Sequence, residues 1–436
     1  MNARLACLTI GLLFCLIAVF TAHSAAPGPL FKFDFGSGPV APGYTRVGAD
    51  TTYLKERGYG FEPGAKITAV GHGGKVPMDG GFCTSEQPFF FSVAMPEGNY
   101  RVTVTLAAAA EESVATIKAE SRRLMLEQVK VAPGKSTTRT FTVNVRTAAL
   151  PDGGSVKLKD REKDYLHWDD KLTLEFNGPR PGLSTLEIER ADNAMTIFLL
   201  GDSTVTDQPR EPYNSWGQML PRFLKPDVAL ANHAESGESL KSSLGARRLD
   251  KVLSSIKSGD YVFIQFGHND QKERGEGVGA FTTYKASLKQ FVSETRQRGA
   301  TPVVITPVAR RNFNAEGQLI NNLGDYPEAV RQVAKEENVA LIDLHAMSRL
   351  FYMALETQGK DVSKKAFAPG DNTHHNNYGS YELARCIVEG IKAAKLPLAK
   401  FIVDDVAAFD PAHPDPIDTF AVPASPNAAS VNPDGN

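Results

Sequence analysis

The chain contains little cysteine and no cluster of basic residues. Four of the 436 residues are cysteine, and two of these, Cys7 and Cys15, lie in an apolar N-terminal segment. The remaining Cys83 and Cys386 are too few for a disulfide scaffold, although one bridge between them is left open. Cys386 lies on the apolar side of "YELARCIVEGIKAA", so core packing is expected there. The formal net charge is −2 with Lys and Arg spread along the chain, which argues against a nucleic-acid partner.

Two catalytic signatures are also missing. The sequence has no G-x-S-x-G, which excludes the nucleophile elbow of the α/β-hydrolases. It has no H-E-x-x-H, and the loops show no other metal-ligand spacing. No metal site is therefore expected.

One long apolar run is present, at residues 5–20, after a single arginine and before the small residues at 24–26. This order is that of a secretory signal peptide. The alternative is an N-terminal membrane anchor, but the run is shorter than the roughly 20 residues that span a bilayer. We expect a signal peptide at 1–26, a mature chain that begins between Ala25 and Pro27, and a secreted or periplasmic protein without a membrane partner.

About 410 residues remain after the signal peptide, which is too long for one ordinary core and favours two domains. Residues 27–192 carry period-two segments such as "YRVTVTLAA", "RTFTVNVRT" and "KLTLEFNG" between turn clusters such as "MPEGNY". Short strands at this spacing, without a convincing helix, predict a β-sandwich.

The pattern changes in residues 193–400, where short apolar runs alternate with amphipathic helices. "MTIFLLG", "VALANH", "YVFIQFG", "TPVVITPV" and "VALIDLH" read as buried strands. This alternation predicts a parallel sheet with helices on both faces, and in such sheets a site forms at the carboxyl ends of the strands. Residues 401–436 form a tail rich in Pro and Asp.

Four positions follow strands or precede the last helix of this domain. They are Ser203 in "GDSTVTD", Gly237 in "NHAESGES", Asn269 in "FGHND" and Asp371 in "DNTHHNNYGS". Each alone has a structural alternative: Ser203, Asn269 and Asp371 as helix caps and Gly237 as a turn residue. Together they favour a site, because all four are expected at the same edge of one sheet.

These residue types suit covalent ester hydrolysis. A serine hydroxyl needs a base within hydrogen-bond reach, and that base needs a carboxylate to orient it. Asp371 and a histidine three residues later supply both from one loop. The N–H groups of Ser203 and Gly237 and the amide of Asn269 could stabilise the oxyanion of a tetrahedral intermediate.

The four blocks, in this order, resemble those of the SGNH (GDSL-like) hydrolase superfamily. Five segments are similar to its rhamnogalacturonan acetylesterase branch: "GDSTV", "YNSWGQML", "TPVARRNF", "GDYPEAVRQVA" and "DNTHHNNYGSYELA". The resemblance covers residues 196–395 and implies a flavodoxin-like three-layer α/β/α domain. "FKFDFGSGPVAPGYTRV" resembles the start of the galactose-binding-like sandwiches found in carbohydrate-active enzymes.

The resemblance assigns roles by position. Ser203 would be the nucleophile, Asp371 the orienting acid, and Ser203, Gly237 and Asn269 the oxyanion hole. The D-x-x-H spacing selects His374 as the base, and His375 is expected at the rim of the cleft or packed beside it, where it could touch substrate. "NNLGDYP" departs from the branch, which has a Thr-His pair before the Gly-Asp; this weakens the substrate assignment alone.

The sequence thus predicts an exported carbohydrate esterase, expected to be monomeric and without a cofactor, that removes acetyl groups from a polysaccharide or oligosaccharide. Pectic rhamnogalacturonan is favoured, since Arg310 and Arg311 follow the fourth strand and could pair with uronic-acid carboxylates. An adjacent arginine pair could also be structural or solvated. The alternatives are an SGNH esterase acting on xylan acetate, a lipid or a thioester, and a non-catalytic glycan-binding protein.

Overall fold

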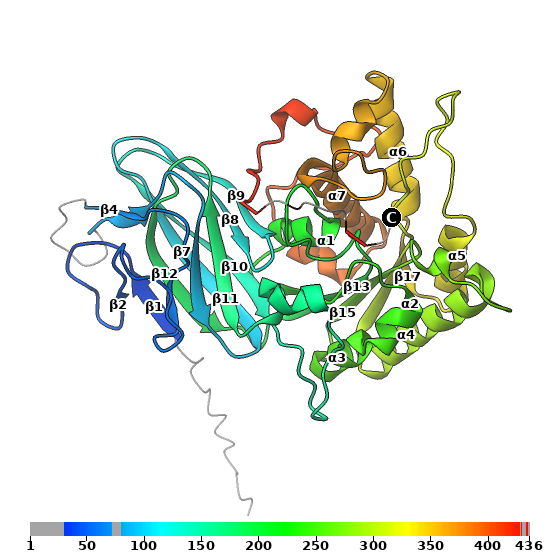
Figure 1. Ribbon diagram of the computed structural model, residues 1–436, viewed down its shortest axis with the longest axis horizontal. Helices are drawn as coiled ribbons and strands as arrows, with labels where there is room; N and C mark the ends of the chain where they lie inside the picture. The colour runs from blue at the N-terminus through cyan, green and yellow to red at the C-terminus, as the bar shows by residue number, and fades with distance from the viewer. Residues whose placement is uncertain (1–29, 72–79, 428, 430–432, 435–436) are drawn as a thin grey trace, which may run out of the picture.

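A computed structural model describes residues 30–71, 80–427, 429 and 433–434 (Figure 1). The predicted signal peptide at 1–26 lies outside the described residues. The boundary predicted after residue 192 falls between the last strand of a sandwich, which ends at Arg190, and the first strand of a parallel sheet, which begins at Met195.

The N-terminal half is a β-sandwich of two sheets. In the first sheet the strand order is β10-β7-β12-β1-β2, with β5 also paired to β12 and β4 to β5. Its strands are β1 (Phe31–Asp34), β2 (Thr45–Arg46), β4 (Thr68–Val70), β5 (Phe82–Thr84), β7 (Gly98–Ala107), β10 (Ser136–Val145) and β12 (Leu183–Arg190). The second sheet has the order β3-β6-β11-β8-β9. Its strands are β3 (Tyr59–Phe61), β6 (Phe89–Ala94), β8 (Ser113–Ala119), β9 (Arg123–Val131) and β11 (Lys171–Asn177).

Strand β7 shows why the period-two pattern makes a sandwich. Val102, Val104 and Leu106 point into the core and are fully buried, because alternate side chains of a strand face opposite sides. On the other face the hydroxyl of Thr103 lies 3.0 Å from that of Thr140 across the pair of β7 with β10.

The C-terminal half is built on a parallel sheet of order β14-β13-β15-β16-β17. Its strands are β13 (Met195–Gly201), β14 (Val228–Asn232), β15 (Tyr261–Gln265), β16 (Thr301–Ile305) and β17 (Ala340–Ile342). The α-helices are α1 (Trp216–Met219), α2 (Leu240–Gly245), α3 (Arg248–Ser255), α4 (Lys285–Gln297), α5 (Tyr326–Glu336), α6 (Leu344–Thr357) and α7 (Asn377–Ala393).

Helices cover both faces of this sheet, which gives the predicted three layers. Ile197 and Leu199 of β13 pack into one core with residues of α1, α6 and α7. Phe198 and Leu200 pack into a second core with residues of α2 to α5. Because both faces are buried, the strands read as continuous apolar runs rather than as alternating ones.

Short helical turns complete the described chain. They are η1 (Asp160–Asp164), η2 (Leu166–Trp168), η3 (Leu220–Phe223), η4 (Asp270–Lys272), η5 (Ala280–Tyr284), η6 (Val362–Ala366), η7 (Pro397–Phe401) and η8 (Ile417–Thr419). In the described part of the chain, no helix has the length and apolarity that crossing a membrane requires.

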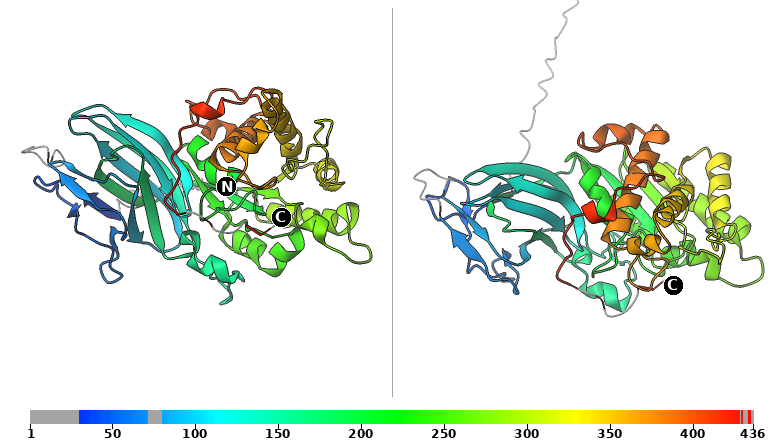
Figure 2. Two further views of the ribbon diagram at one scale, coloured as in Figure 1. Left: turned by 45° about the horizontal axis from the view of Figure 1, so that its top comes forward. Right: turned by 90° about the horizontal axis from the view of Figure 1, so that it is seen from above.

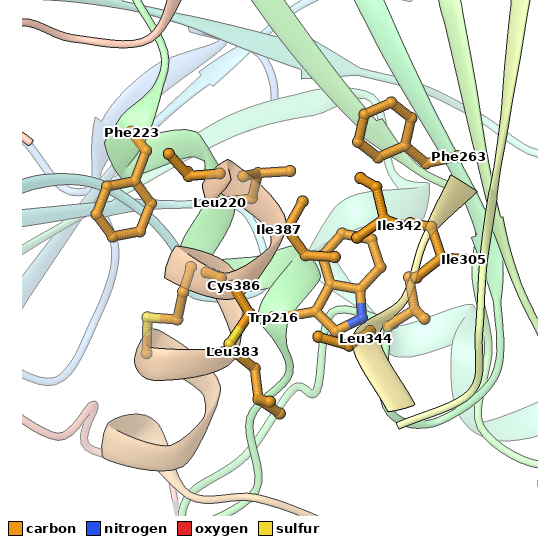
Figure 3. Packing of buried hydrophobic residues seen from close by; sticks show 14 of the residues in the cluster. Trp216, Leu220, Phe223, Phe263, Ile305, Ile342, Leu344, Leu383, Cys386 and Ile387 are labelled. Carbon is orange, nitrogen blue, oxygen red and sulfur yellow. The ribbon is translucent and has the colours of Figure 1, made fainter. Parts of the chain in front are cut away.

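Cys386 is a core residue, as its place in the α7 pattern predicts. Figure 3 shows it among Trp216, Leu383 and Ile387 in the core beneath the parallel sheet. Cys83 is buried in the separate core of the sandwich. Both thiols are free, so the bridge between them that the sequence left open is not formed.

The two halves meet through ion pairs, most of which are buried. Ion pairs that join them include Arg123 with Asp207 at 2.6 Å, Arg122 with Glu211 at 2.5 Å, Glu162 with Arg248 at 2.6 Å and Glu97 with Lys251 at 2.8 Å. Figure 1 shows the sandwich against one flank of the α/β half. Since a buried charge is costly without its partner, these pairs fix one half on the other.

The Pro- and Asp-rich tail returns along this boundary, as the red segment in Figures 1 and 2 shows. The Ser425 hydroxyl donates to Glu175 of the sandwich at 2.7 Å, and the Ser425 N–H donates to Glu211 of the α/β half at 2.8 Å. Lys118 donates to the Pro423 carbonyl at 2.7 Å. The predicted tail is therefore packed against both halves.

Candidate active site

The structure brings the loops that hold the predicted residues to the carboxyl edge of the parallel sheet. Ser203 follows β13, Gly237 lies in the loop between β14 and α2, and Asn269 follows β15. Asp371 and His374 lie in the loop that leads into α7. This edge is where the strands of a parallel sheet present side chains to a ligand.

Asp371, His374 and Ser203 form a continuous hydrogen-bonded row. The Nδ1 of His374 lies 2.8 Å from Asp371 Oδ2, and its Nε2 lies 2.8 Å from Ser203 Oγ. The other carboxylate oxygen of Asp371 accepts the N–H groups of Thr373 at 2.7 Å and His374 at 3.0 Å. The short spacing in "DNTH" therefore lets one loop position both the acid and the base.

The charge on Asp371 suits an orienting role. Burial alone would raise its pKa, but the His374 side chain and the two loop N–H groups outweigh that effect. The pKa of Asp371 consequently lies well below its usual range. The carboxylate stays ionised at neutral pH and holds Nδ1–H of His374, which leaves Nε2 to accept the Ser203 proton.

The turn that presents Ser203 is fixed by its neighbour Asp202. Asp202 Oδ1 accepts the N–H of Thr204 at 3.0 Å and its hydroxyl at 2.8 Å. Asp202 Oδ2 lies 3.0 Å from Nδ1 of His268. Burial lowers the pKa of His268, so the neutral ring donates from Nδ1 to Asp202. This second Asp–His pair locks the nucleophile turn onto the Asn269 loop.

Three donors suited to an oxyanion lie on the loops beside Ser203. In the described residues, no acceptor takes the N–H of Ser203 or of Gly237. Gly237 has φ +80°, in the left-handed region that favours glycine. Asn269 Nδ2 donates one hydrogen to the Glu238 carbonyl at 3.0 Å, which orients the amide and leaves its second hydrogen for a ligand.

Arg310 lies in the wall of the site. Its Nε donates to Thr373 Oγ1 at 3.2 Å and its Nη2 to the His268 carbonyl at 3.3 Å. The Gln271 side-chain oxygen also accepts from this guanidinium. All of these acceptors are neutral, and the carboxylates of Asp202 and Asp371 favour the charge of Arg310 without forming an ion pair with it in the described chain. The guanidinium therefore stays charged and can bind an anionic ligand.

The structure places Arg311 away from the site, in contrast to its predicted role in substrate binding. The side chain turns inward and is buried. Its Nε donates to Ser363 at 2.7 Å and its Nη2 pairs with Asp361 at 2.8 Å. These contacts tie the loop after β16 to η6, so the guanidinium has a structural role.

The structure also places His375 away from solvent, which fits the predicted alternative that it packs beside the cleft and not a position at the rim. The ring is 1% exposed, its Nε2 lies 2.7 Å from the Tyr352 hydroxyl, and its centroid lies 4.4 Å from that of Phe367. Burial is the main cause that lowers the pKa of His375, to about 3. His375 is a neutral core residue behind the site rather than a residue at its rim.

Sequence reasoning missed the contribution of the sandwich to this site. Arg123 holds Asp207, which follows the nucleophile turn, and Arg161 of η1 pairs with Glu235 beside Gly237 at 2.6 Å. These pairs join residues far apart in the chain, and no local pattern marks them. Asp202 and His268 flank two predicted residues, and their positions directly before Ser203 and Asn269 are the signal that could have found them.

No group of three or more His, Cys, Asp or Glu side chains is placed to hold a metal ion in the residues that the structure describes.

Comparison with known proteins places this geometry in a family. Residues 199–380 match the model of the GDSL-like lipase/acylhydrolase family. The chain is 38% identical over 222 residues to the rhamnogalacturonan acetylesterase RhgT of Bacillus subtilis (strain 168), a match that covers 94% of RhgT and 48% of this chain. The chain belongs to the GDSL-like lipase/acylhydrolase family. It is a carboxylic ester hydrolase, and the superfamily resemblance drawn from its sequence is confirmed.

The N-terminal half also has relatives. Residues 31–150 match the beta-agarase/YXIM esterase-like, galactose-binding domain-like model, which confirms the predicted resemblance of the sandwich. The uncharacterized esterase YxiM of Bacillus subtilis (strain 168) is 29% identical over 397 residues, covering 87% of this hydrolase and 95% of YxiM. The crystal structure of the Bacillus subtilis YxiM protein is 25% identical, covers 84% of this chain and 99% of its own, and has a TM-score of 0.43.

Proposed function

We propose that this hydrolase is an exported carbohydrate esterase that removes O-acetyl groups from pectic rhamnogalacturonan. The observation that carries the proposal is the hydrogen-bonded row of Ser203, His374 and Asp371 beside three oxyanion donors. A non-catalytic glycan-binding protein would have no use for this arrangement.

The reaction follows from the positions of these groups. Ser203 Oγ attacks the ester carbonyl carbon while His374 Nε2 takes the hydroxyl proton. The negative charge on the carbonyl oxygen is stabilised by the N–H groups of Ser203 and Gly237 and by the Asn269 amide. His374 then gives its proton to the departing sugar oxygen, which leaves an acetyl group on Ser203.

Water completes the cycle. His374 takes a proton from a water molecule that attacks the acetyl-serine, and it returns that proton to Ser203 Oγ as acetate leaves. Asp371 remains ionised throughout and stabilises the imidazolium that forms twice.

The pectic substrate is supported by similarity and by charge. RhgT, and the probable rhamnogalacturonan acetylesterase YesY of Bacillus subtilis (strain 168) at 37% identity over 214 residues, carry that polymer in their names. YesY is covered over 98% of its length and this chain over 48%. Arg310, without a carboxylate partner in the described residues, offers a cation that a uronic acid can use.

The test is acetate release from a panel of acetylated polymers: rhamnogalacturonan, homogalacturonan and xylan, with p-nitrophenyl acetate as the small ester. We expect the highest kcat/KM on rhamnogalacturonan, and no release by Ser203→Ala. A preference for xylan acetate would replace the pectic substrate and keep the esterase chemistry. No release from any ester by the folded wild type would reject the proposal.

Export is the second part of the proposal, and it rests on the apolar run at 5–20 and the small residues after it. The intact mass of protein recovered outside the cytoplasm should correspond to a first residue between Ala25 and Pro27. A mass that includes residues 5–20 would instead support a membrane-tethered enzyme.

A further inference from the structure

Arg161 reaches the candidate site from the sandwich half. It lies on η1, in the connection between β10 and β11, and contacts the loop between β14 and α2. Its Nε and Nη2 donate to Glu235 at 3.0 and 2.6 Å, and Nη2 also donates to the Ser236 carbonyl at 2.8 Å. These three bonds fix the guanidinium plane and leave Nη1 at its outer end.

A carboxylate of the same chain occupies that outer end. Nη1 of Arg161 donates to Asp434 Oδ2, near the C-terminus. Because Nε and Nη2 already donate to the Glu235 loop, Nη1 is the nitrogen that remains for the carboxylate of a ligand, and Asp434 occupies it.

This ion pair borders the oxyanion donors. A methyl group placed on Gly237 would lie 3.0 Å from Asp434 Cβ and 3.3 Å from Lys159 Nζ. Lys159 adds a second cation there, which donates to the Ser236 carbonyl and lies 3.4 Å from Glu238. Ser203 itself is 0% exposed, so an ester that binds there must displace a neighbouring group.

The charges around the loop leave Arg161 able to bind an anion. Burial, and then repulsion from Glu162, raise the pKa of Glu235 to about 7, while Arg248 and Arg161 oppose the rise. Glu162 pairs with Arg248 at 2.6 Å. The acids of the loop are therefore engaged with Arg248, Lys159 and the inner side of Arg161, and the outer Nη1 faces Asp434.

We propose that Arg161, with Lys159 beside it, binds the carboxylate of a uronic-acid residue at or next to the acetylated sugar, and that Asp434 occupies this subsite and competes with the substrate. The inference rests on the proposed esterase function and names the residues that select an acidic chain. The Asp434 side chain is 60% exposed, and an ion pair with so exposed a partner is weak enough to be exchanged for another carboxylate.

Asp434→Asn tests the competition, because it removes the charge and keeps the shape of the side chain. We expect KM on acetylated rhamnogalacturonan oligosaccharides to fall roughly two- to tenfold. KM on acetylated xylo-oligosaccharides should neither rise nor fall by such a factor. Calorimetry with free D-galacturonate as the probe should show tighter binding to Asp434→Asn than to wild type, with D-galactose as the neutral control. Equal KM values and equal galacturonate affinity in the two proteins would reject the competition.

Arg161→Gln tests the subsite itself. Loss of a charge-assisted bond should lower the ratio of kcat/KM on acidic to neutral oligosaccharides about 10- to 100-fold, and Arg161→Lys should restore part of it. Arg247→Gln is the matched control: its side chain is 32% exposed against 33% for Arg161, and it also has two carboxylate partners, Asp152 and Asp250. An unchanged ratio in Arg161→Gln, or an equal fall in Arg247→Gln, would overturn the proposal.

The two levels of the proposal fail in different ways. If the wild type releases no acetate from any ester, the proposed function fails. If it does release acetate while Asp434→Asn and Arg161→Gln keep the wild-type ratio, the esterase stands and the subsite is rejected. Arg161→Gln leaves the buried Glu235 without its counter-charge, so thermal melting must first show that this variant is folded. If Arg161→Gln does not fold, the result with Asp434→Asn decides whether the subsite is accepted or rejected.

Discussion

The His375 imidazole lies 2.7 Å from the Tyr352 hydroxyl, while the adjacent His374 lies 2.8 Å from Ser203 Oγ. His375 forms bridges with Asn214 and Phe367, so its backbone is extended and successive side chains face opposite sides. One histidine of the pair therefore belongs to the site and the other to the core.

His374→Ala should lower kcat/KM on p-nitrophenyl acetate by at least about 10³, since the nucleophile and base act as a unit. His375→Ala should keep activity per folded molecule within about tenfold and lose about 2 kcal/mol or more of stability, because it opens a cavity and removes a hydrogen-bond partner of the Tyr352 hydroxyl. Steady-state kinetics with urea denaturation separate the two effects. Equal catalytic losses in two stable variants would contradict this division.

Asn269→Ala should lower kcat roughly 10²- to 10³-fold with little change in KM, because the amide meets charge that develops only in the transition state. Asn314→Ala, at a partly exposed position, serves as the control substitution. A raised KM with an unchanged kcat would mean that Asn269 binds the substrate instead.

Arg311→Gln should destabilise the protein by about 1 to 3 kcal/mol, since a buried guanidinium loses its hydrogen bond to Ser363. It also loses its ion pair with Asp361, whose side chain is 44% exposed. Its kcat/KM per folded molecule should match the wild type. Arg310→Gln should do the reverse, with stability nearly unchanged and kcat/KM on acetylated rhamnogalacturonan lower by about 10- to 100-fold. Loss of stability in both variants would assign both arginines to the fold.

The buried His375 makes stability depend on pH. Burial is the main cause that lowers its pKa, to about 3, while an unfolded histidine titrates near 6.5. Between these values the unfolded chain binds a proton that the folded chain does not, so the free energy of unfolding falls as the pH drops below about 6.5. At pH 5 this effect amounts to about 2 kcal/mol.

Chemical denaturation at pH 7 and pH 5 checks this effect. The loss of stability between the two pH values should be about 2 kcal/mol smaller in His375→Phe than in the wild type. His413→Gln, which removes a histidine whose side chain is 84% exposed, should keep the wild-type loss. If His375→Phe loses as much stability between pH 7 and pH 5 as the wild type does, His375 is not the cause of the pH dependence.

The strands and the row of Ser203, His374 and Asp371 could be read from the sequence because they depend on local information. Apolar runs mark the buried strands, and the residues after them meet at one sheet edge whatever the rest of the chain does. The geometry of Asp371 and His374 is set within one loop by the two N–H groups that Asp371 accepts.

The arginines could not be assigned in this way. Arg310 and Arg311 are adjacent in the chain, but their environments differ. Only Arg311 donates to Asp361 and Ser363, which lie about fifty positions away in the sequence. Arg161 and Asp434 are 273 positions apart. Pairings of this kind depend on the tertiary fold, and no periodicity records them.

The buried pairs between the halves limit how this enzyme can change in evolution. RhgT matches only 48% of the chain, so a hydrolase of this family can exist without a matching sandwich. Here, deletion of the sandwich would leave Asp207, whose side chain is fully buried beside Arg123, and Glu235, beside Arg161, without those cations. The same deletion would open both carboxylates to solvent, so a descendant without the sandwich would have to hold the turn after Ser203 and the Gly237 loop by other contacts.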